Sequence, residues 1–386
     1  MKEVIFSIFV LICFIPSAFS EGQIEYTYNK IMVNETDSSA LKNTAITPVL
    51  EAKIVPNKNL VYCATFQLAW NELSDTVYHD TITLENSPEY AVQLSRKMFK
   101  KEYLSGDSYV AGAGVVGEGI IEELKTDLKQ KFDYIEKVLE EPWPAGSILF
   151  YAYMSKNLPF KNVFDGTLYI NFEFGEERRQ VSAFGYSSGT EGMFDKIRDQ
   201  VKIFYYEEKT GNCIVSLVSE SMNDEIILAK ILPGKTLLET VQKTLERVSR
   251  ADAEELAFND TIVIPKIIFK LGHTFKDLYY KQITTVHPRL KGYYITVAKQ
   301  TIDFRLDEKG AMLVSRGSGG AEGIASTARS LIYDRPFIVM LRQKDAPYPY
   351  FAAWIADPEL LIDYNSPDEK DIDDAGDQAV QSPEGK

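Results

Sequence analysis

Two strand patterns near the C-terminus enclose a long segment without apolar periodicity, and this arrangement constrains the fold more than any other feature. In residues 301–306 apolar and polar side chains alternate, which predicts a half-buried strand. Residues 335–342 are apolar on both faces, which is typical of a strand buried on both sides. Between them, residues 311–333 carry few large apolar side chains and include the run Gly317-Ser318-Gly319-Gly320. A loop of this length inside a compact domain usually has a function.

The residues that border this loop carry a family resemblance. The first strand ends in Asp307-Glu308-Lys309-Gly310, the second begins at Arg335-Pro336-Phe337, and a third runs from Phe351 to Asp357-Pro358. This order resembles the C-terminal part of serpins, which mostly inhibit proteases by offering an exposed reactive loop as bait. Four earlier segments resemble the middle of that family: Ser221-Met222, Ile231-Leu232-Pro233, Thr236-Leu237-Leu238-Glu239 and Ile264-Pro265-Lys266.

The resemblance, which covers about residues 148–358, implies a serpin-like α/β (α+β) fold. Its features are a single domain, about three β-sheets surrounded by helices, and an exposed reactive-type loop. A large mixed sheet is expected beside the strand 301–306. We expect three parts in the chain: a signal peptide at 1–20, the serpin-like domain at 21–362 and an acidic disordered tail at 363–386.

Several local patterns add detail. Residues 118–141 predict an amphipathic helix, because seven apolar residues from Ile120 to Leu139 recur at helical spacing. Residues 148–153 predict an apolar strand, and residues 201–206 and 213–218 a hairpin. Thr236 and Glu239 form a capping box that opens a helix. Residues 261–270 predict one strand, with Pro265 marking a bulge or an edge.

The composition excludes some kinds of partner and site. The chain has 386 residues and a net charge of −14 without a basic run, which argues against nucleic acid. His79, His273 and His287 are scattered and show no metal-ligand spacing, so we expect neither a metal nor a cofactor.

The N-terminus predicts export. Lys2 precedes an apolar run from Val4 to Ile15, and small residues follow at Ala18-Phe19-Ser20. We therefore expect a secreted, extracellular protein, or a periplasmic one if the source is bacterial. Cys63 and Cys213 would form one bridge or remain buried thiols, and the sequence leaves both open. The glycosylation patterns at Asn34 and Asn259 bear only on a eukaryotic source.

The resemblance also implies which loop residues matter. The hinge comprises Glu308, Gly310, Ala311, Met312 and Leu313. Counting from the hinge, the bond that a protease cuts falls near Ile324-Ala325, with Arg329-Ser330 as an alternative suited to a trypsin-like protease. Inhibition requires the cut loop to insert quickly into a sheet as a strand. Leu313 is larger than the residues typical of inhibitory hinges, and glycines weaken strands, so the sequence predicts poor or absent inhibition.

The resemblance implies an extracellular serine or cysteine protease as the partner. It also implies a monomeric protein without turnover of its own. A non-inhibitory carrier, scaffold or chaperone of the same fold is the main alternative. A remote one is a hydrolase using Ser187, since Gly185-Tyr186-Ser187-Ser188-Gly189 fits a nucleophile elbow. That enzyme would need His273 or His287 as its base, and a surface turn explains the pattern better.

Overall fold

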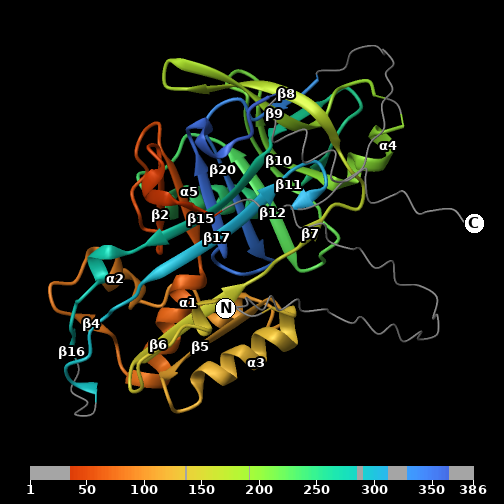
Figure 1. The fold of residues 1–386 in the computed structure, drawn as a ribbon. Helices are drawn as coiled ribbons and strands as arrows, with labels where there is room; N and C mark the ends of the chain where they lie inside the picture. The colour runs from red at the N-terminus through yellow and green to blue at the C-terminus, as the bar shows by residue number, and fades with distance from the viewer. Residues whose placement is uncertain (1–34, 135–136, 191, 285–289, 312–327, 365–386) are drawn as a thin grey trace, which may run out of the picture.

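The computed structural model describes residues 35–134, 137–190, 192–284, 290–311 and 328–364 (Figure 1). The expected signal peptide lies outside these residues, as does the tail from residue 365 onward. Asp363 and Tyr364, at the start of the expected tail, contact the sheets. Asp363 forms an ion pair with Arg179 at 2.6 Å, and the ring of Tyr364 lies 4.7 Å from that of Tyr169.

The largest sheet has eight strands and holds the centre of the core. Its strands follow the order β13-β10-β11-β12-β20-β21-β3-β2, so the two C-terminal strands lie in the middle. The hairpin β10/β11 agrees with the sequence pattern. The bounds are β2 (Thr44–Thr47), β3 (Asn59–Cys63), β10 (Val201–Glu207), β11 (Asn212–Leu217), β12 (Asp224–Lys230), β13 (Glu254–Glu255), β20 (Phe337–Gln343) and β21 (Phe351–Ile355).

The helix α5 (Leu237–Arg250) buries Leu237 and Val241 in the same core. Its start is set by the predicted capping box. The Thr236 Oγ1 accepts a hydrogen bond from the Glu239 N–H at 3.1 Å, and the Glu239 carboxylate accepts one from the Lys235 N–H at 2.7 Å.

A four-stranded sheet and a three-stranded sheet complete the larger architecture, in the orders β19-β14-β9-β8 and β1-β15-β17. The prediction of one strand over 261–270 was wrong, because the chain passes from one sheet to the other there. The strand β14 ends at Pro265, which lacks the N–H that a continuing ladder needs. The bounds are β8 (Asp165–Phe174), β9 (Glu177–Tyr186), β14 (Thr261–Pro265), β19 (Ser330–Ile332), β1 (Thr36–Asp37), β15 (Ile267–Thr274) and β17 (Lys299–Leu306).

The antiparallel pair β5 (Tyr109–Val115) and β6 (Ile148–Met154) is covered by α3 (Ile120–Phe132). The predicted helix 118–141 was too long. Asp133 adopts a left-handed conformation with φ of 49° and ends the helix. Gly114 lets the helix approach, since a Cβ there would lie 3.0 Å from the Cβ of Ile120.

Short elements connect these parts. The helix α1 (Thr65–Glu72) is buried along its whole length and continues into the π-helical segment η2 (Leu73–Tyr78). The others are η1 (Ser38–Ala40), β4 (Thr83–Leu84), α2 (Glu89–Leu94), η3 (Lys101–Tyr103), η4 (Lys137–Leu139), β7 (Leu158–Pro159), α4 (Phe194–Ile197), η5 (Arg198–Gln200), η6 (Lys276–Leu278), β16 (Ile283–Thr284), β18 (Gly310–Ala311) and η8 (Pro358–Leu360).

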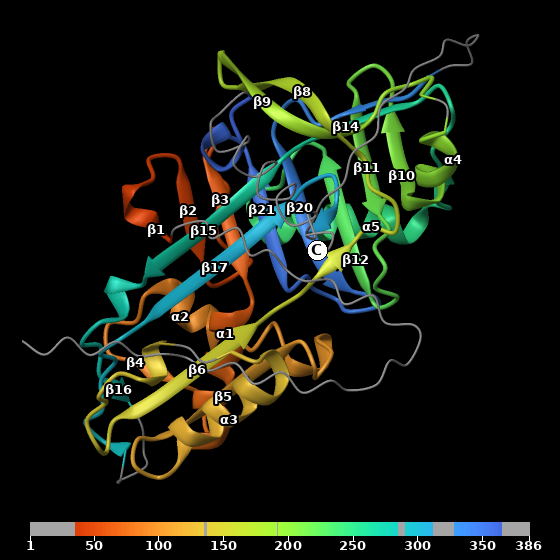
Figure 2. The ribbon, with the colours of Figure 1, turned by 45° about the vertical axis from the view of Figure 1, so that its right-hand side comes forward.

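The mixed α/β architecture with three larger sheets agrees with the fold class that the sequence predicted. The sheet beside residues 301–306 is smaller than expected, however. The strand β17 lies at the edge of three strands, and the large mixed sheet is the eight-stranded one. Within the described residues, β17 pairs only with β15, and the pair β5/β6 lies separately (Figure 2).

Candidate hinge and groove

A cavity of about 1280 Å³ separates β6 from β17. Residues 148–156 line one side of it and residues 299–305 the other, while residues of α1 also contribute to its wall. In the described part of the chain β6 pairs with β5 alone and β17 with β15 alone. Each strand therefore presents one edge whose backbone donors and acceptors are available to a further strand.

The two sides of this groove meet at one end, where β18 pairs with β7. The pairing is antiparallel, with Gly310 opposite Pro159 and Ala311 opposite Leu158. Just before it the chain reverses direction in a tight turn. Asp307 and Gly310 exchange two backbone hydrogen bonds of 3.0 and 3.2 Å, which leaves Glu308 and Lys309 as the two turn residues.

Gly310 is required at this turn. Its φ of 119° lies in a region that side chains rarely adopt, and a Cβ would lie 2.5 Å from the Leu158 carbonyl oxygen. The backbone of the turn is fixed on the other side as well. The Phe160 N–H donates to the Lys309 carbonyl and the Phe164 N–H to the Glu308 carbonyl, both at 2.9 Å.

The turn carries a cluster of buried charges. The side chains of Asp307, Glu308 and Lys309 are 1%, 10% and 2% exposed. Arg305 forms an ion pair with Asp307. The Glu308 carboxylate lies 3.4 Å from the ammonium of Lys266 and 3.4 Å from that of Lys309. Opposite charges thus compensate the loss of hydration of each group.

Burial shifts the pKa values of these groups in directions that the ion pairs modify. Burial and then the Glu308 carboxylate raise the pKa of Asp307, although Arg305 opposes the shift. Burial alone would raise the pKa of Glu308, but the Lys266 and Lys309 ammonium groups lower it below its ordinary value. Burial lowers the pKa of Lys309. The pKa of each charged side chain in the hinge therefore depends on the charges beside it.

Arg329 fixes the other end of the loop. Its guanidinium donates to the Asp260 carboxylate at 2.7 and 3.0 Å, and its backbone N–H donates to the same group at 2.8 Å. It also forms an ion pair with Glu254. Asp260 is 1% exposed. Directly afterwards Ser330 begins β19, which pairs in parallel with β14.

The structure therefore brings together part of the predicted site. Glu308, Gly310 and the backbone of Ala311 lie at the end of the groove where β18 pairs with β7, and Arg329 and Ser330 lie at a separate anchor. Met312, Leu313, Ile324 and Ala325 lie outside the described residues. Sequence reasoning missed two partners, Lys266 for Glu308 and Asp260 for Arg329. Lys266 stood in a segment that carried the resemblance, and Asp260 stood inside a glycosylation pattern.

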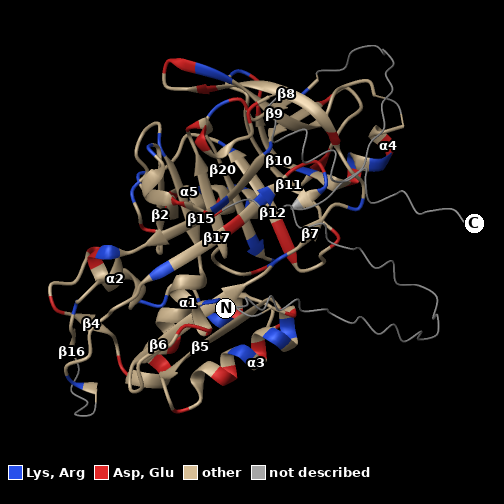
Figure 3. Cartoon of the chain, in the orientation of Figure 1, with Lys and Arg blue, Asp and Glu red and all other residues tan. Residues whose placement is uncertain are grey.

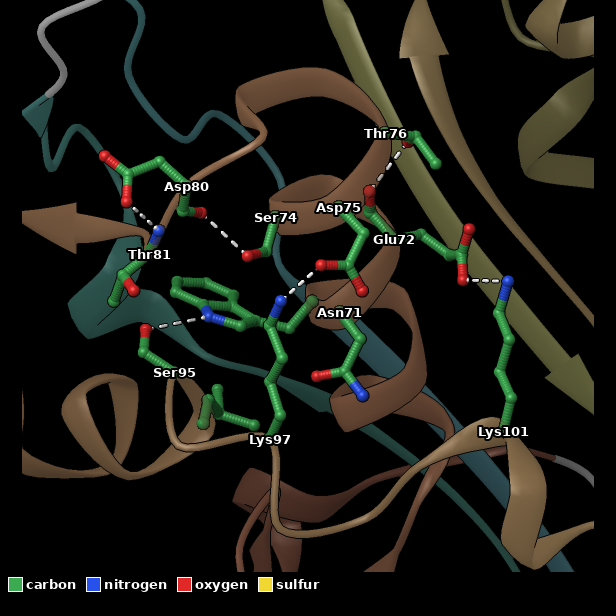
Figure 4. Close-up of polar contacts among 12 residues, drawn as sticks. Asn71, Glu72, Ser74, Asp75, Thr76, Asp80, Thr81, Ser95, Lys97 and Lys101 are labelled. Carbon is green, nitrogen blue, oxygen red and sulfur yellow. Dashed lines mark hydrogen bonds and ion pairs between the residues drawn. The ribbon is translucent and has the colours of Figure 1, made fainter.

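Polar contacts around the end of α1 hold this helix in place (Figure 4). Asn71 donates to the Phe99 carbonyl at 2.8 Å, so a buried amide ties the helix to the following loop. Three further contacts fix the end of α1 and the start of η2. They join Glu72 to Lys101, Asp75 to Lys97, and the Ser74 Oγ to the Asp80 carbonyl.

Ser187 does not belong to a triad with His273. The Nδ1 of His273 lies 2.7 Å from the Oγ of Ser38, beside β1 and β15. The strand before Ser187 is β9, and its Gly185 is explained by packing. A Cβ at Gly185 would lie 1.9 Å from the Ile262 carbonyl oxygen of the neighbouring strand. The other candidate base, His287, lies outside the described residues.

Three other features of the described chain concern its thiols, possible metal sites and membrane-spanning helices. Cys63 and Cys213 are both buried free thiols, and burial raises the pKa of each. Nowhere in the described ranges do three or more His, Cys, Asp or Glu residues gather as a metal site would need. Nor does any helix there reach the length and apolarity needed to cross a membrane. Acidic and basic residues are interspersed along β17 and α3 (Figure 3).

Comparison with solved structures finds serpins. Mouse protein-Z dependent protease inhibitor is 12% identical with a TM-score of 0.46, and the match covers 78% of this chain and 91% of that one. A serpin from the trematode Schistosoma haematobium is 13% identical with a TM-score of 0.45, over 78% and 94% of the two chains. Human thyroxine-binding globulin complexed with thyroxine is 10% identical with a TM-score of 0.42, over 79% and 93%.

The mixed α/β architecture is the one that the sequence motifs predict. No family model matches the sequence, and a search of curated proteins finds no match.

Proposed function

We propose that the chain engages an extracellular serine or cysteine protease through residues 308–333 and inhibits it inefficiently. The observation that carries this proposal is the groove between β6 and β17. At one end of it, the turn before Gly310 reverses the chain and β18 pairs with β7. A strand added there would find unpaired backbone groups on both sides. Such a protein acts by trapping a protease and has no turnover of its own.

The observed pairs set the register of the added strand. Asp307 lies opposite Gly310, and Ala311 lies opposite Leu158. If the chain continues past Ala311 as a strand, both pairings continue in the same register. Residue 313 would then lie opposite Phe304 on β17 and opposite Lys156 beyond β6. Residue 315 would lie opposite Ile302. Phe304 and Ile302 belong to the buried face of β17, so residues 313 and 315 would face the core.

Leu313 is the reason that we expect inhibition to be inefficient. Both of its neighbours in this register already have partners. The Phe304 ring stacks on Phe351 at 4.2 Å between centroids, and Lys156 forms an ion pair with Asp224 at 3.0 Å. We expect a Leu side chain to fit beside these paired groups less well than a small residue would, which slows insertion. The protease then has time to hydrolyse the bond and leave.

We also propose that the cut falls at Ile324-Ala325. The alternative bond follows Arg329, whose side chain is committed to Asp260 and Glu254. A trypsin-like protease would have to extract that guanidinium from its ion pairs before its own pocket could bind it.

The test is to mix the protein with trypsin-, elastase- and subtilisin-like proteases and to separate the products under denaturing conditions. We expect a small amount of covalent complex beside a larger amount of cleaved chain, with mass spectrometry placing the new end at Ala325. Cleavage only outside residues 317–330, or complex formation close to one inhibitor per protease, would contradict the proposal.

Secretion completes the proposal. We propose that residues 1–20 are removed as a signal peptide and that residues 21–362 form the serpin-like domain. N-terminal sequencing of the protein recovered from the culture medium of expressing cells should begin at Glu21. Retention of the full chain inside the cells would contradict this step.

A further inference from the structure

The strand β9 has an open edge along half of its length. On one side β9 pairs with β8 from end to end. On the other side, within the described residues, β14 covers only residues 183–186. The side chains show the same division, since residues 177–180 are exposed and residues 181–186 are buried. An exposed strand edge invites pairing with another segment, so folded proteins usually cover it.

The last described residues of the chain begin to cover this edge. The Ser182 N–H donates to the Ile362 carbonyl at 2.8 Å, and the Tyr364 N–H donates to the Gln180 carbonyl at 3.3 Å. Both bonds belong to one antiparallel register, because the numbers rise along one segment as they fall along the other. Alternation along β9 then directs the N–H and C=O of every second residue, Arg178 included, toward this side.

The charges favour a continuation of the same pairing. Arg179 forms an ion pair with Asp363 at 2.6 Å, and Arg178 forms one with Glu173 on β8 at 2.6 Å. Both arginine side chains remain exposed at the uncovered end of β9. The chain goes on past this point, and residues 365–374 carry five acidic residues and one lysine. An acidic segment is therefore tethered directly beside two exposed guanidinium groups.

We propose that residues 365–366 continue the pairing as a short strand on the open edge of β9, so that the chain covers this edge with its own tail. In this register the Arg178 N–H donates to the Ser366 carbonyl, and the Ser366 N–H donates to the Arg178 carbonyl. The strand ends near Pro367, because the acidic residues that follow would meet Glu176 at the β8/β9 turn, and like charges destabilise such a pair. This contact does not depend on the proposed inhibition.

Hydrogen exchange, measured residue by residue on the full chain, tests the pairing. Ser366→Pro removes the N–H that faces β9, whereas Asn365→Pro removes one that faces away, which an edge strand tolerates. We expect the Arg178 amide to exchange about three- to tenfold faster in Ser366→Pro than in the unaltered protein, as for the loss of one backbone hydrogen bond. Asn365→Pro should leave that rate nearly unchanged.

The Arg179 amide is the internal control, because alternation directs it toward β8. Its exchange rate should be the same in the unaltered protein and in both variants. Equally fast exchange of the Arg178 amide in the unaltered protein and in Ser366→Pro would overturn the proposal. Equal acceleration in the two proline variants would overturn it as well, since only one of them removes a donor that faces β9.

Discussion

If the proposed inhibition is correct, substitution of Leu313 by Ala should make it more efficient. The register projected from the hinge places residue 313 between Phe304 and Lys156. Phe304 is 6% exposed and is stacked on Phe351, and the Lys156 side chain is 12% exposed and is paired with Asp224. Neither neighbour can move without losing a contact. Removing three carbon atoms at position 313 therefore relieves crowding in the inserted state.

The size of the effect follows from the usual cost of overpacking. Forcing extra methylene groups into a packed site costs about 1–3 kcal/mol. Since about 1.4 kcal/mol changes a rate tenfold, Leu313→Ala should speed insertion by roughly five- to 150-fold. If about ten inhibitor molecules are consumed for each protease trapped, a tenfold faster insertion lowers that number to about two.

The assay is a titration of a fixed amount of protease with increasing inhibitor, which gives the number of molecules consumed per protease inactivated. Val314→Ala is the control, because alternation along a strand places residue 314 on the opposite face. Val314→Ala should leave the number of inhibitor molecules consumed per protease nearly unchanged. An equal improvement in both variants, or none in Leu313→Ala, would show that the crowding argument is wrong.

Three further predictions concern the hinge, the distal anchor and pH. Lys266→Met leaves the buried Glu308 carboxylate with less compensation and should lower the free energy of unfolding by about 3 kcal/mol in urea titrations, and a loss below about 1 kcal/mol would contradict it. Arg329→Met leaves the buried Asp260 carboxylate without its guanidinium partner, so limited proteolysis should cut near residue 329 faster than in the unaltered protein, and unchanged cleavage would argue against the anchor. Burial lowers the pKa of His273 from its ordinary 6.5 in the folded state, so its contribution to stability is present above that pH and is lost as the pH falls through it. Melting temperatures measured from pH 8 to pH 5 should fall less in His273→Gln than in the unaltered protein, and parallel curves would refute this role.

Much of the fold followed from local sequence patterns. The capping box at Thr236 and the apolar strand from Ile148 both appear where the residues predict them. Each depends on interactions between residues a few positions apart, which a sequence displays directly. Helix ends were less predictable. Asp133 ends α3 through its backbone conformation while the apolar spacing continues past it.

Parts of the candidate site depend on contacts that no local pattern reveals. Arg329 and Asp260 are 69 positions apart, and Gln300 and Cys63 are 237 positions apart. Which charge meets which carboxylate is decided only when the sheets pack together. The groove lies between two strand edges that do not pair with each other. A sequence predicts where strands form more readily than it predicts which strands pair.

The position of the last strands has a consequence for any cut in the loop. A break near Ile324 would divide the polypeptide into two pieces, the second of which contains β19, β20 and β21. The strand β20 lies between β12 and β21, and β21 lies between β20 and β3, so the smaller piece supplies the middle of the largest sheet. The cut protein is therefore an obligate heterodimer made from one gene product. It should migrate as one species in a native gel, and its two parts should separate only when the sheet itself is unfolded.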